Sequence, residues 1–574
     1  MGKKKQKRQQ QGPQGPKSAE AAASEASAKA GRAPEGASSE GEASPAPPRS
    51  GLARLSPYLL ILFGAHLPYL AFVGFGIWPL AFIAFVPFLF VLESERSRGA
   101  GGKRIFLLGW LQGTIQHAGG YHWLTEMLEN FSGFGTLANV GISSIFWIFQ
   151  GLQMGIFAWL YLRGRARGWP ILPLAVIAFS ATEFIFPFLF PAVIGNSFFP
   201  VPMLIQIVDL GGPILTSMLY VALNAGIFLL LQALIRRERP AAFWPAIAAG
   251  SLLLTLGYGA VRISQIDART QLSPKITVGL VQVNMGIFDK REDPREGQRR
   301  HIEDTIRLEA EVNPDLIIWP ESAYTYFLPP DVENVRRYVT GRITTPLLFG
   351  GLQRREERHY NTAFMVDGEG DVIATYDKTH LLAFGEYLPF GETFPELYEW
   401  SPNSGHFTPG DHQRPLPFAD YRISTLVCYE DVLPGFTRAA VREANPHLLV
   451  NITNDAWFGD TQEPWIHLAL AQFRAVEHHR YLARATNSGV SAIIDPVGRI
   501  TAQSGVFTRE TVHGEVAMMT GWTLYQTLGS WPAWLAIAML GWMAFGKRRA
   551  RPAPSSTSPR SRREAPPPGD RPGA

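Results

Sequence analysis

Long apolar runs alternate with short polar connections in the first half of the chain, between Pro57 and Val261. Each run is long enough to cross a hydrocarbon layer of about 30 Å, because a helix rises about 1.5 Å per residue. Pro and Gly within the runs are tolerable in a bundle, since neighbouring helices satisfy the freed backbone groups. We therefore predict seven transmembrane helices here and an eighth near the C-terminus. The expected spans are 57–73, 75–93, 105–122, 138–162, 171–190, 213–235, 242–261 and 522–545.

The positive charges in the connections follow the order that a membrane bundle requires. Lys and Arg gather in the N-terminal tail and after the second, fourth, sixth and eighth expected spans. The intervening loops, YHWLTEMLENFSGFG and FPAVIGNSFFPVP, contain neither residue type. Cytoplasmic loops of membrane proteins are enriched in Lys and Arg. We therefore expect both termini in the cytoplasm and, by parity, the segment between the seventh and eighth spans on the opposite side.

The segment from about 262 to 520 has a different pattern. Short β-type runs such as KITVGLVQV, DLIIWPE, RISTLVCYE and HLLVNITN alternate with amphipathic stretches. The stretch PWIHLALAQFRAVEHHRYLAR predicts one helix, with Leu468, Leu470, Phe473 and Val476 near one face. About 250 residues are enough for a complete hydrophobic core. We predict an α/β domain outside the cytoplasm, attached to a membrane bundle by its seventh and eighth helices.

Both ends of the chain are basic and have almost no apolar residues to bury. This composition predicts disordered cytoplasmic tails at 1–54 and 547–574. No aromatic residues are interleaved with the charges, as base stacking would require, so we expect no nucleic-acid partner. A solvated tail near anionic lipid is the better interpretation.

Cys428 is the one cysteine of the chain, and it stands between the apolar run RISTLV and the stretch YEDVLPGF. A single cysteine cannot form an internal disulfide or a zinc site of four cysteines. A packed structural residue is the usual role of a free cysteine. A nucleophile at the end of a strand, near helix N–H groups, is the alternative. Because an unused thiol is a liability in an oxidising compartment, the second interpretation gains weight.

A cysteine nucleophile with an ordinary pKa of about 8.5 needs a base or a cation nearby. His478 and His479 are candidate bases, but we expect them in the middle of a helix with one ring facing solvent. Glu321 in LIIWPES is the other candidate, because it follows an apolar strand. The carboxyl ends of such strands point into the crevice where α/β proteins usually bind ligands.

Lys378, in YDKTHLLAFGEYLPFGE, could supply the cation. Glu386 follows it in the same stretch and could orient its ammonium, and Glu430 comes directly after the Cys-Tyr pair. Taken singly, each of these charged residues is more often a surface charge than a catalytic group. Together, Glu321, Lys378 and Cys428 form an ordered set of base, cation and nucleophile.

The motifs WPES, YDKTHLLAFGEYLPF, LVCYED and NDAWFGD resemble the Glu-Lys-Cys signature of the nitrilase superfamily. With eight spans around such a domain, the chain is similar to the bacterial apolipoprotein N-acyltransferases over roughly residues 55–545. In the membrane half, TEF and IQIVDLGGPILTS look like patterns of that family. The resemblance implies seven membrane helices in 55–261, a four-layer α-β-β-α catalytic domain in 262–520 and the eighth helix in 521–546.

The resemblance also implies roles for individual residues. Glu321 corresponds to the general base, Cys428 to the nucleophile and Lys378 to a stabiliser of the tetrahedral oxyanion. One departure concerns a Trp of the family. The family often has the motif VQxN, then a short spacer that ends in Lys, and then this Trp. Here Arg291 follows Lys290, so that Trp role is vacant or shifted to Phe288. The implied supporting and substrate-binding residues are Glu386, Tyr429, Glu430 and Trp457. Of these, Trp457 would line the acyl or substrate entrance.

Two further features have open interpretations. Glu183 lies inside the fifth expected span, where a carboxylate is a candidate for function, although a structural hydrogen bond between helices is slightly favoured. The stretch AFGEYLPFGETFPELYEW could form a lid that dips into the lipid interface through Phe384, Leu388 and Phe390. An ordinary core loop is the equally supported alternative.

The resemblance implies transfer of a fatty acyl chain from a phospholipid to the α-amine of a diacylglyceryl-modified apolipoprotein, through a thioester on Cys428. It implies a monomer in the bacterial inner membrane that contacts membrane lipids, with the catalytic domain on the periplasmic side. The sequence has no P-loop, dinucleotide fingerprint or metal cluster, so we expect neither cofactor nor metal. A membrane-anchored amidase or nitrile hydrolase with the same three residues stays open, although eight spans are many for a tether. A non-enzymatic receptor or transporter also stays open, although all three positions are filled.

Overall fold

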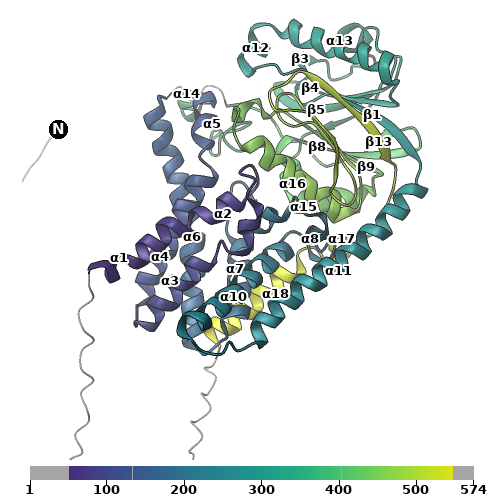
Figure 1. The fold of residues 1–574 in the computed structure, drawn as a ribbon. Helices are drawn as coiled ribbons and strands as arrows, with labels where there is room; N and C mark the ends of the chain where they lie inside the picture. The colour runs from purple at the N-terminus through teal and green to yellow at the C-terminus, as the bar shows by residue number, and fades with distance from the viewer. Residues whose placement is uncertain (1–50, 132–133, 402–403, 547–574) are drawn as a thin grey trace, which may run out of the picture. The chain divides into compact units, whose positions relative to one another are not determined.

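The computed structural model describes residues 51–131, 134–401 and 404–546 (Figure 1). The chain divides into the units Met1–Ala53 and Arg54–Ala574, and the second unit contains both sheets and all but the first residues of the helical part. The tail predicted at 547–574 lies outside the described residues, as does the tail predicted at 1–54 except for its last four residues.

The first half of the described chain is helical, as its apolar runs predict. The helices are α1 (Gly51–Gly64), α2 (His66–Ala71), η1 (Trp78–Phe82), α3 (Val86–Ser97), α4 (Gly102–Gly120), α5 (Leu124–Phe131), α6 (Thr136–Ala166), α7 (Ile171–Ile185), η2 (Ile194–Phe198), α8 (Pro202–Ile205), α9 (Val208–Gly211), α10 (Ile214–Arg236) and α11 (Phe243–Leu272). After the α/β part come α17 (Leu524–Leu528) and α18 (Trp531–Phe545).

Within the described residues, four helical stretches are long and apolar enough to cross a membrane: Trp78–Ser97, Thr136–Ala166, Ile214–Arg236 and Phe243–Leu272. Shorter apolar helices occupy Leu55–Ala71, Ile171–Ile185, Pro202–Gly211 and Trp531–Phe545. The span predicted at 105–122 forms α4, but this helix is in neither group. Its glycines and its polar residues, which include Gln112, Gln116 and His117, dilute its apolar character.

Several predicted span boundaries differ from the structure. The fifth span ends at Ile185 rather than at residue 190, because Pro187 cannot continue a helix. The predicted span 522–545 is wrong at its start: α17 is a separate short helix that ends at Leu528, and Gly529, with a φ of 61°, separates it from α18. The seventh helix continues to Leu272, well past the expected end at residue 261.

Helices α4 and α6 approach each other closely through glycines. A Cβ atom at Gly113 would lie 2.6 Å from the carbonyl oxygen of Gly151 and 2.8 Å from its Cα. A Cβ at Gly155 would likewise meet Phe106 at 3.0 Å. The pair formed by Gly151 and Gly155 therefore has the close-packing role expected for small residues at a membrane helix interface.

The α/β part contains two sheets. The first has the strand order β13-β1-β2-β4-β5-β6, with β3 paired to β4, and the second has the order β12-β11-β10-β9-β8-β7. The strands of the first sheet are β1 (Lys275–Gln282), β2 (Leu316–Ile318), β3 (Tyr324–Leu328), β4 (Leu347–Arg355), β5 (Arg358–Val366), β6 (Val372–Asp377) and β13 (Glu510–Ala517). The strands of the second are β7 (Leu416–Phe418), β8 (Tyr421–Val427), β9 (Leu448–Thr453), β10 (Leu482–Thr486), β11 (Ala492–Ile494) and β12 (Ile500–Gln503).

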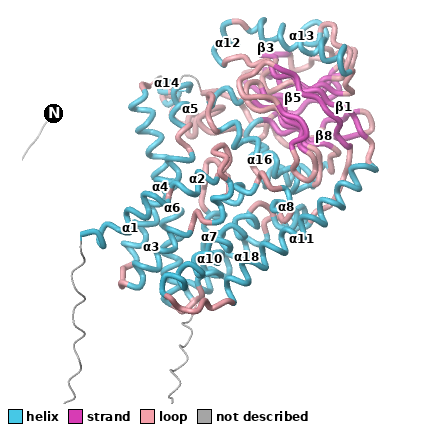
Figure 2. The backbone as a smooth tube through the Cα atoms, viewed as in Figure 1, coloured by secondary structure: helices cyan, strands magenta, loops and turns pink. Residues whose placement is uncertain are grey.

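The two sheets pack face to face, and helices cover their outer faces (Figures 1 and 2). Side chains from both sheets, including Leu280, Ile318 and Val450, form one buried core between them. Helix α13 (Pro294–Val312) covers the first sheet, and α15 (Pro434–Ala444) and α16 (Glu463–His478) cover the second. This is the α-β-β-α sandwich that the resemblance implies.

Helix α16 joins the sandwich to the helical part. The stretch in which this helix is predicted runs to Arg484, but α16 ends at His478 and residues 482–486 form β10. The two parts pack through aromatic rings: those of Trp123 and Phe458 lie edge to face with centroids 5.4 Å apart. Every residue from Ile466 to His478 is buried, so α16 has no solvent-facing side and acts as the shared core of both parts.

The contact between α4 and α6 gives a matched test of packing. Gly113→Ala places a methyl group against the backbone of Gly151, and overpacking of this kind costs about 1–3 kcal/mol. Gly141→Ala, also inside a helix, meets nothing within 4 Å and should be neutral or slightly stabilising. We expect thermal unfolding in detergent to show a lower Tm for Gly113→Ala only. Equal Tm values for the two variants would contradict this close approach.

Candidate active site

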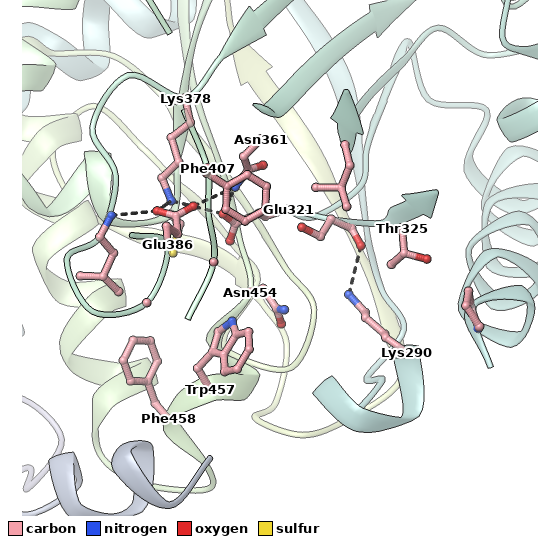
Figure 3. Close-up of a pocket in the computed structure, with 17 residues that line it drawn as sticks. Lys290, Glu321, Thr325, Asn361, Lys378, Glu386, Phe407, Asn454, Trp457 and Phe458 are labelled. Atoms are coloured by element: carbon pink, nitrogen blue, oxygen red, sulfur yellow. Dashed lines mark hydrogen bonds and ion pairs between the residues drawn. The ribbon is translucent and has the colours of Figure 1, made fainter. Parts of the chain in front are cut away.

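A cavity of about 400 Å³ opens in the sandwich at the ends of β2, β6 and β8 (Figure 3). Its wall combines charged side chains with apolar ones. The cavity is lined by Lys290, Pro294, Glu321, Ser322, Thr325, Leu352, Asn361, Lys378, Leu382, Gly385, Glu386, Gly405, Phe407, Cys428, Asn454, Trp457 and Phe458. The three residues of the predicted base, cation and nucleophile set are therefore brought to one cavity from three separate segments.

Cys428 follows β8 directly and begins the short helix η4 (Cys428–Val432). Its φ of 52° lies in the left-handed region, which costs free energy for a residue with a Cβ. Cys428 is 8% exposed and forms part of the cavity wall. A strained turn between a strand and a helix presents a side chain at the edge of a sheet, as a nucleophile requires.

Lys378 follows β6 and is only 1% exposed. Its Nζ lies 2.7 Å from Glu386 Oε2 and 3.3 Å from Glu321 Oε1. Asn361 Nδ2 donates to the same two carboxylates, at 2.7 Å to Glu321 Oε1 and 3.1 Å to Glu386 Oε1 (Figure 3). One ammonium and one amide thus hold two carboxylates, the buried one of Glu321 and the partly buried one of Glu386.

Glu321 is placed by a close approach of the backbone. It follows β2 through Trp319 and Pro320, and a Cβ atom at Gly350 on β4 would lie 2.6 Å from its Cα. Only glycine leaves room for the chain at this point. The next residue, Ser322, has a φ of 52°, in the left-handed region.

The charges of the cavity act on one another. Burial alone would lower the pKa of Lys378, but Glu321 and Glu386 raise it well above its ordinary value. Burial and Glu321 raise the pKa of Cys428 well above the usual range of a thiol, against the opposing effect of Lys378. The cavity therefore holds a permanent ammonium beside a neutral thiol at neutral pH.

Glu430 has a different role from the cavity residues. Its Oε2 accepts from the backbone N–H of Val427 at 2.8 Å, and its Oε1 accepts from Thr379 N at 2.8 Å and from Tyr376 Oη at 2.8 Å. It is fully buried and does not line the cavity. Through these hydrogen bonds, Glu430 links the turn at Cys428 to the segment that carries Lys378.

The other predicted site residues are not all in the cavity. Trp457 lines it, whereas the hydroxyl of Tyr429 points to the helical part and donates to Leu189 O at 2.5 Å. Glu183 is also outside this cavity: its Oε1 accepts from the backbone N–H of Ile194 at 2.7 Å. This contact joins α7 to η2 within the helical part, and the role of Glu183 stays a prediction.

The expectation for the two histidines is wrong in both respects. They stand at the end of α16 rather than in its middle, since His478 is its last residue and His479 caps it with a φ of 50°. Neither faces solvent, because both are fully buried. His479 Nε2 lies 2.9 Å from Asp209 Oδ2, on the helical side of the molecule. Neither ring lines the cavity of Cys428, so a papain-like His base is not formed here.

Aromatic side chains of the predicted lid are exposed. Phe384 and Phe390 are 55% and 75% exposed and both have positive φ values, whereas Leu388 is buried. An ordinary core loop therefore does not describe the two phenylalanines. On α12 (Ile287–Glu292), Phe288 is 49% exposed and does not line the cavity, and the side chain of Arg291 lies outside the described part of the chain.

A fully buried group of charges lies behind the cysteine turn. His467 Nε2 is 2.7 Å from Asp431 Oδ1, and its Nδ1 is 3.0 Å from Asp455 Oδ1. Arg484 bonds both aspartates. Burial and Arg484 would lower the pKa of His467, but the two aspartates raise it to about 10. Asp455, Glu463 and His467 are close enough to hold a metal ion, yet each ring nitrogen already faces an aspartate and Arg484 contacts both aspartates, so this donor set suits an ion network.

Sequence reasoning gave no role to several polar residues of the cavity, among them Lys290, Asn361 and Asn454. Lys290 is visible in the sequence only as the end of a spacer, and Asn361 as a polar residue inside an apolar strand. A polar residue in a buried strand was the available signal for Asn361. No local pattern distinguishes Lys290 from a surface lysine.

A second cavity, of about 500 Å³, adjoins the first, and Leu382 and Gly385 line both. Its wall is almost entirely apolar and comes from the helical part and the lid segment. Its other lining residues are Leu124, Met127, Leu128, Phe134, Ile142, Ile145, Phe146, Phe149, Leu189, Phe190, Ala383, Phe384, Leu388, Pro389, Leu397 and Ser401. A charged pocket and an apolar groove therefore meet at one loop.

The pKa of the single thiol is measurable by its rate of alkylation. Because burial and Glu321 raise the pKa of Cys428, iodoacetamide labelling should rise continuously from about pH 7 to about pH 10. Glu321→Gln removes a negative charge and should shift the profile to lower pH, whereas Lys378→Met removes the opposing positive charge and should shift it to higher pH. Mass spectrometry of the intact chain follows the label. A plateau already reached below pH 7 would show a preformed thiolate and contradict this arrangement.

Comparisons with known proteins match both the α/β part and the helical part of the chain. The chain matches the carbon-nitrogen hydrolase model over residues 277–522 and the apolipoprotein N-acyltransferase N-terminal domain over residues 64–226. Among solved structures, Saccharomyces cerevisiae Nit3, a member of branch 10 of the nitrilase superfamily, is 18% identical, with a TM-score of 0.32. The match covers 42% of this chain and 90% of that one.

Curated relatives cover most of the chain. Apolipoprotein N-acyltransferase of Geobacter metallireducens is 31% identical over 84% of this chain and 93% of its own length. Its counterpart in Azotobacter vinelandii is 32% identical over 86% and 96%, and that in Pseudomonas putida is 31% identical over 86% and 97%. The chain belongs to the apolipoprotein N-acyltransferase family.

Proposed function

We propose that this protein transfers a fatty acyl chain from a membrane phospholipid to the N-terminal α-amine of a diacylglyceryl-modified apolipoprotein, through a thioester on Cys428. The observation that carries the proposal is the junction of two cavities. A pocket with Glu321, Lys378 and Cys428 opens beside an apolar groove formed by helices α5 and α6 and the lid segment. An ester carbonyl and its alkyl chain need these two environments side by side.

The first half-reaction uses the three charged residues as base, cation and nucleophile. Glu321 accepts the proton of the Cys428 thiol, and the thiolate attacks the ester carbonyl of the phospholipid. The C–O bond then breaks, the proton passes from Glu321 to the leaving alkoxide, and lysophospholipid departs. The acyl group stays on sulfur as a thioester, which divides a slow aminolysis into two steps with lower barriers.

Charge in the pocket changes little during these steps. Moving the thiol proton to Glu321 leaves the net charge of the buried group the same, so no new charge is desolvated. The Lys378 ammonium then lies where negative charge develops on the carbonyl oxygen, and such preorganised donors stabilise the oxyanion. Glu386 keeps the ammonium in position, because it holds Nζ at 2.7 Å.

The second half-reaction reuses the same groups. The α-amine of the acceptor attacks the thioester carbonyl and gives a proton to Glu321. The C–S bond breaks, the amide forms, and the Cys428 sulfur takes back a proton. Because the acceptor binds after the lysophospholipid has left, the kinetics should be ping-pong.

The membrane half fits substrates that carry acyl chains. Pulling such chains into water costs about 0.8 kcal/mol per CH₂, so the reaction is best carried out with the tails still in lipid. We place eight helices across the bacterial inner membrane, both termini in the cytoplasm, and the catalytic domain of about 262–520 on the periplasmic side. The alternation of Lys and Arg between successive loops supports this orientation.

Two substitutions test the roles of the pocket residues. Cys428→Ala should abolish transfer from phospholipid to a diacylglyceryl peptide in detergent micelles, because no thioester can form. Lys378→Ala should slow it by roughly a hundredfold or more, since loss of one oxyanion contact costs about this much elsewhere. Lys275→Ala is the matched control, because its side chain is 45% exposed on β1 and, among the described residues, forms its ion pair with the exposed Glu515.

Near-normal transfer by Lys378→Ala would overturn the role given to this lysine. Transfer by Cys428→Ala would overturn the thioester route altogether. An enzyme that hydrolyses small amides or nitriles but leaves phospholipids intact would instead support the membrane-anchored hydrolase that the sequence leaves open.

A further inference from the structure

A second lysine lines the cavity of Cys428. Lys290 lies on α12, is 6% exposed, and extends its side chain towards the segment that follows Glu321 (Figure 3). Its Nζ has one hydrogen-bond acceptor among the described residues, the carbonyl oxygen of Ser322 at 3.4 Å. This single contact is long for an ammonium, which can donate three hydrogen bonds.

The two lysines of the cavity differ in what balances their charge. Lys378 contacts two carboxylates within 3.3 Å, so it is neutralised within the protein. Lys290 makes no ion pair with a carboxylate in the described part of the chain. Burial lowers its pKa to about 8, against the opposing effect of Glu321, so it is still mainly protonated at neutral pH. A buried ammonium with unused donors is stabilised by any anion that enters the cavity.

We propose that Lys290 binds the phosphodiester of the phospholipid donor while its ester carbonyl lies at Cys428. This inference rests on the proposed function and names the part of the donor that the pocket recognises. In a glycerophospholipid the phosphate and the acyl ester are separated by a short glycerol unit, so both reach one cavity. The acyl chain of the donor lies in the adjoining apolar groove, Lys378 stabilises the oxyanion at the carbonyl, and Lys290 binds the phosphate.

A lysine that binds the phosphate affects which donors react. The diacylglyceryl cysteine of the acceptor carries no phosphate, so Lys290 should act in the first half-reaction and not in the second. All phospholipids carry the phosphodiester, whatever their headgroup. Donor choice through Lys290 therefore distinguishes phospholipids from neutral glycerides and does not distinguish one headgroup from another.

The test compares two donors that differ in the phosphate. The full-length enzyme in detergent micelles is given dipalmitoylphosphatidylglycerol or dipalmitoylglycerol without acceptor, and acylation of Cys428 is followed by intact mass in a single turnover. Lys290→Met should slow acylation by the phospholipid roughly ten- to a hundredfold, the usual loss for a hydrogen bond to a charged group. It should leave acylation by dipalmitoylglycerol within about twofold, and Lys290→Arg should retain most of the preference for phospholipid.

Controls separate this proposal from a structural role and from the proposed function. Lys275→Met removes an exposed lysine and should change neither rate. Equal losses of Lys290→Met with both donors, or no loss with phospholipid, would overturn the assignment. If the methionine variant does not fold, as judged by its reaction with p-nitrophenyl palmitate, Lys290→Gln takes its place in the same comparison. Failure of the unsubstituted enzyme to be acylated by either lipid would instead count against the thioester route.

Discussion

The buried ammonium of Lys378 sets the constraint on which the rest of the site depends. An ammonium that is 1% exposed is stable only with carboxylates in contact, and Glu321 and Glu386 supply them at 3.3 and 2.7 Å. In the proposed mechanism, the same pairing brings the base Glu321 next to the thiol of Cys428 and keeps the positive charge of Lys378 where the oxyanion forms. Removing either carboxylate would unbalance the charge, and breaking a buried pair of this kind costs about 3–5 kcal/mol.

Three chain segments far apart in sequence must meet for this pairing to exist, and the sandwich brings them together. Glu321 follows β2, Lys378 follows β6 and Cys428 follows β8, so each comes from the end of a strand. Glu430 then ties two of the segments by accepting from backbone groups of both. The sandwich in turn shares α16 with the helices, which places the pocket next to an apolar groove.

Much of this arrangement could be predicted from the sequence, because it depends on strong local patterns. Apolar runs predicted the helices, alternating runs the sheets, and the lone Cys428 with its ordered partners the pocket. Boundaries were less predictable: Gly529 splits the last span, and α16 ends early because His479 adopts a left-handed conformation. Whether a polar residue such as Lys290 lies inside depends on distant packing, and nothing in its neighbours along the chain reveals that.

The most direct test of the central claim is the mass of the protein after incubation with a phospholipid carrying isotope-labelled acyl chains and no acceptor. We predict one labelled acyl group on Cys428, removed by hydroxylamine and lost when a diacylglyceryl peptide is added, with the label recovered on the α-amine of that peptide. Labelled peptide formed without any acyl group ever present on Cys428 would contradict the account.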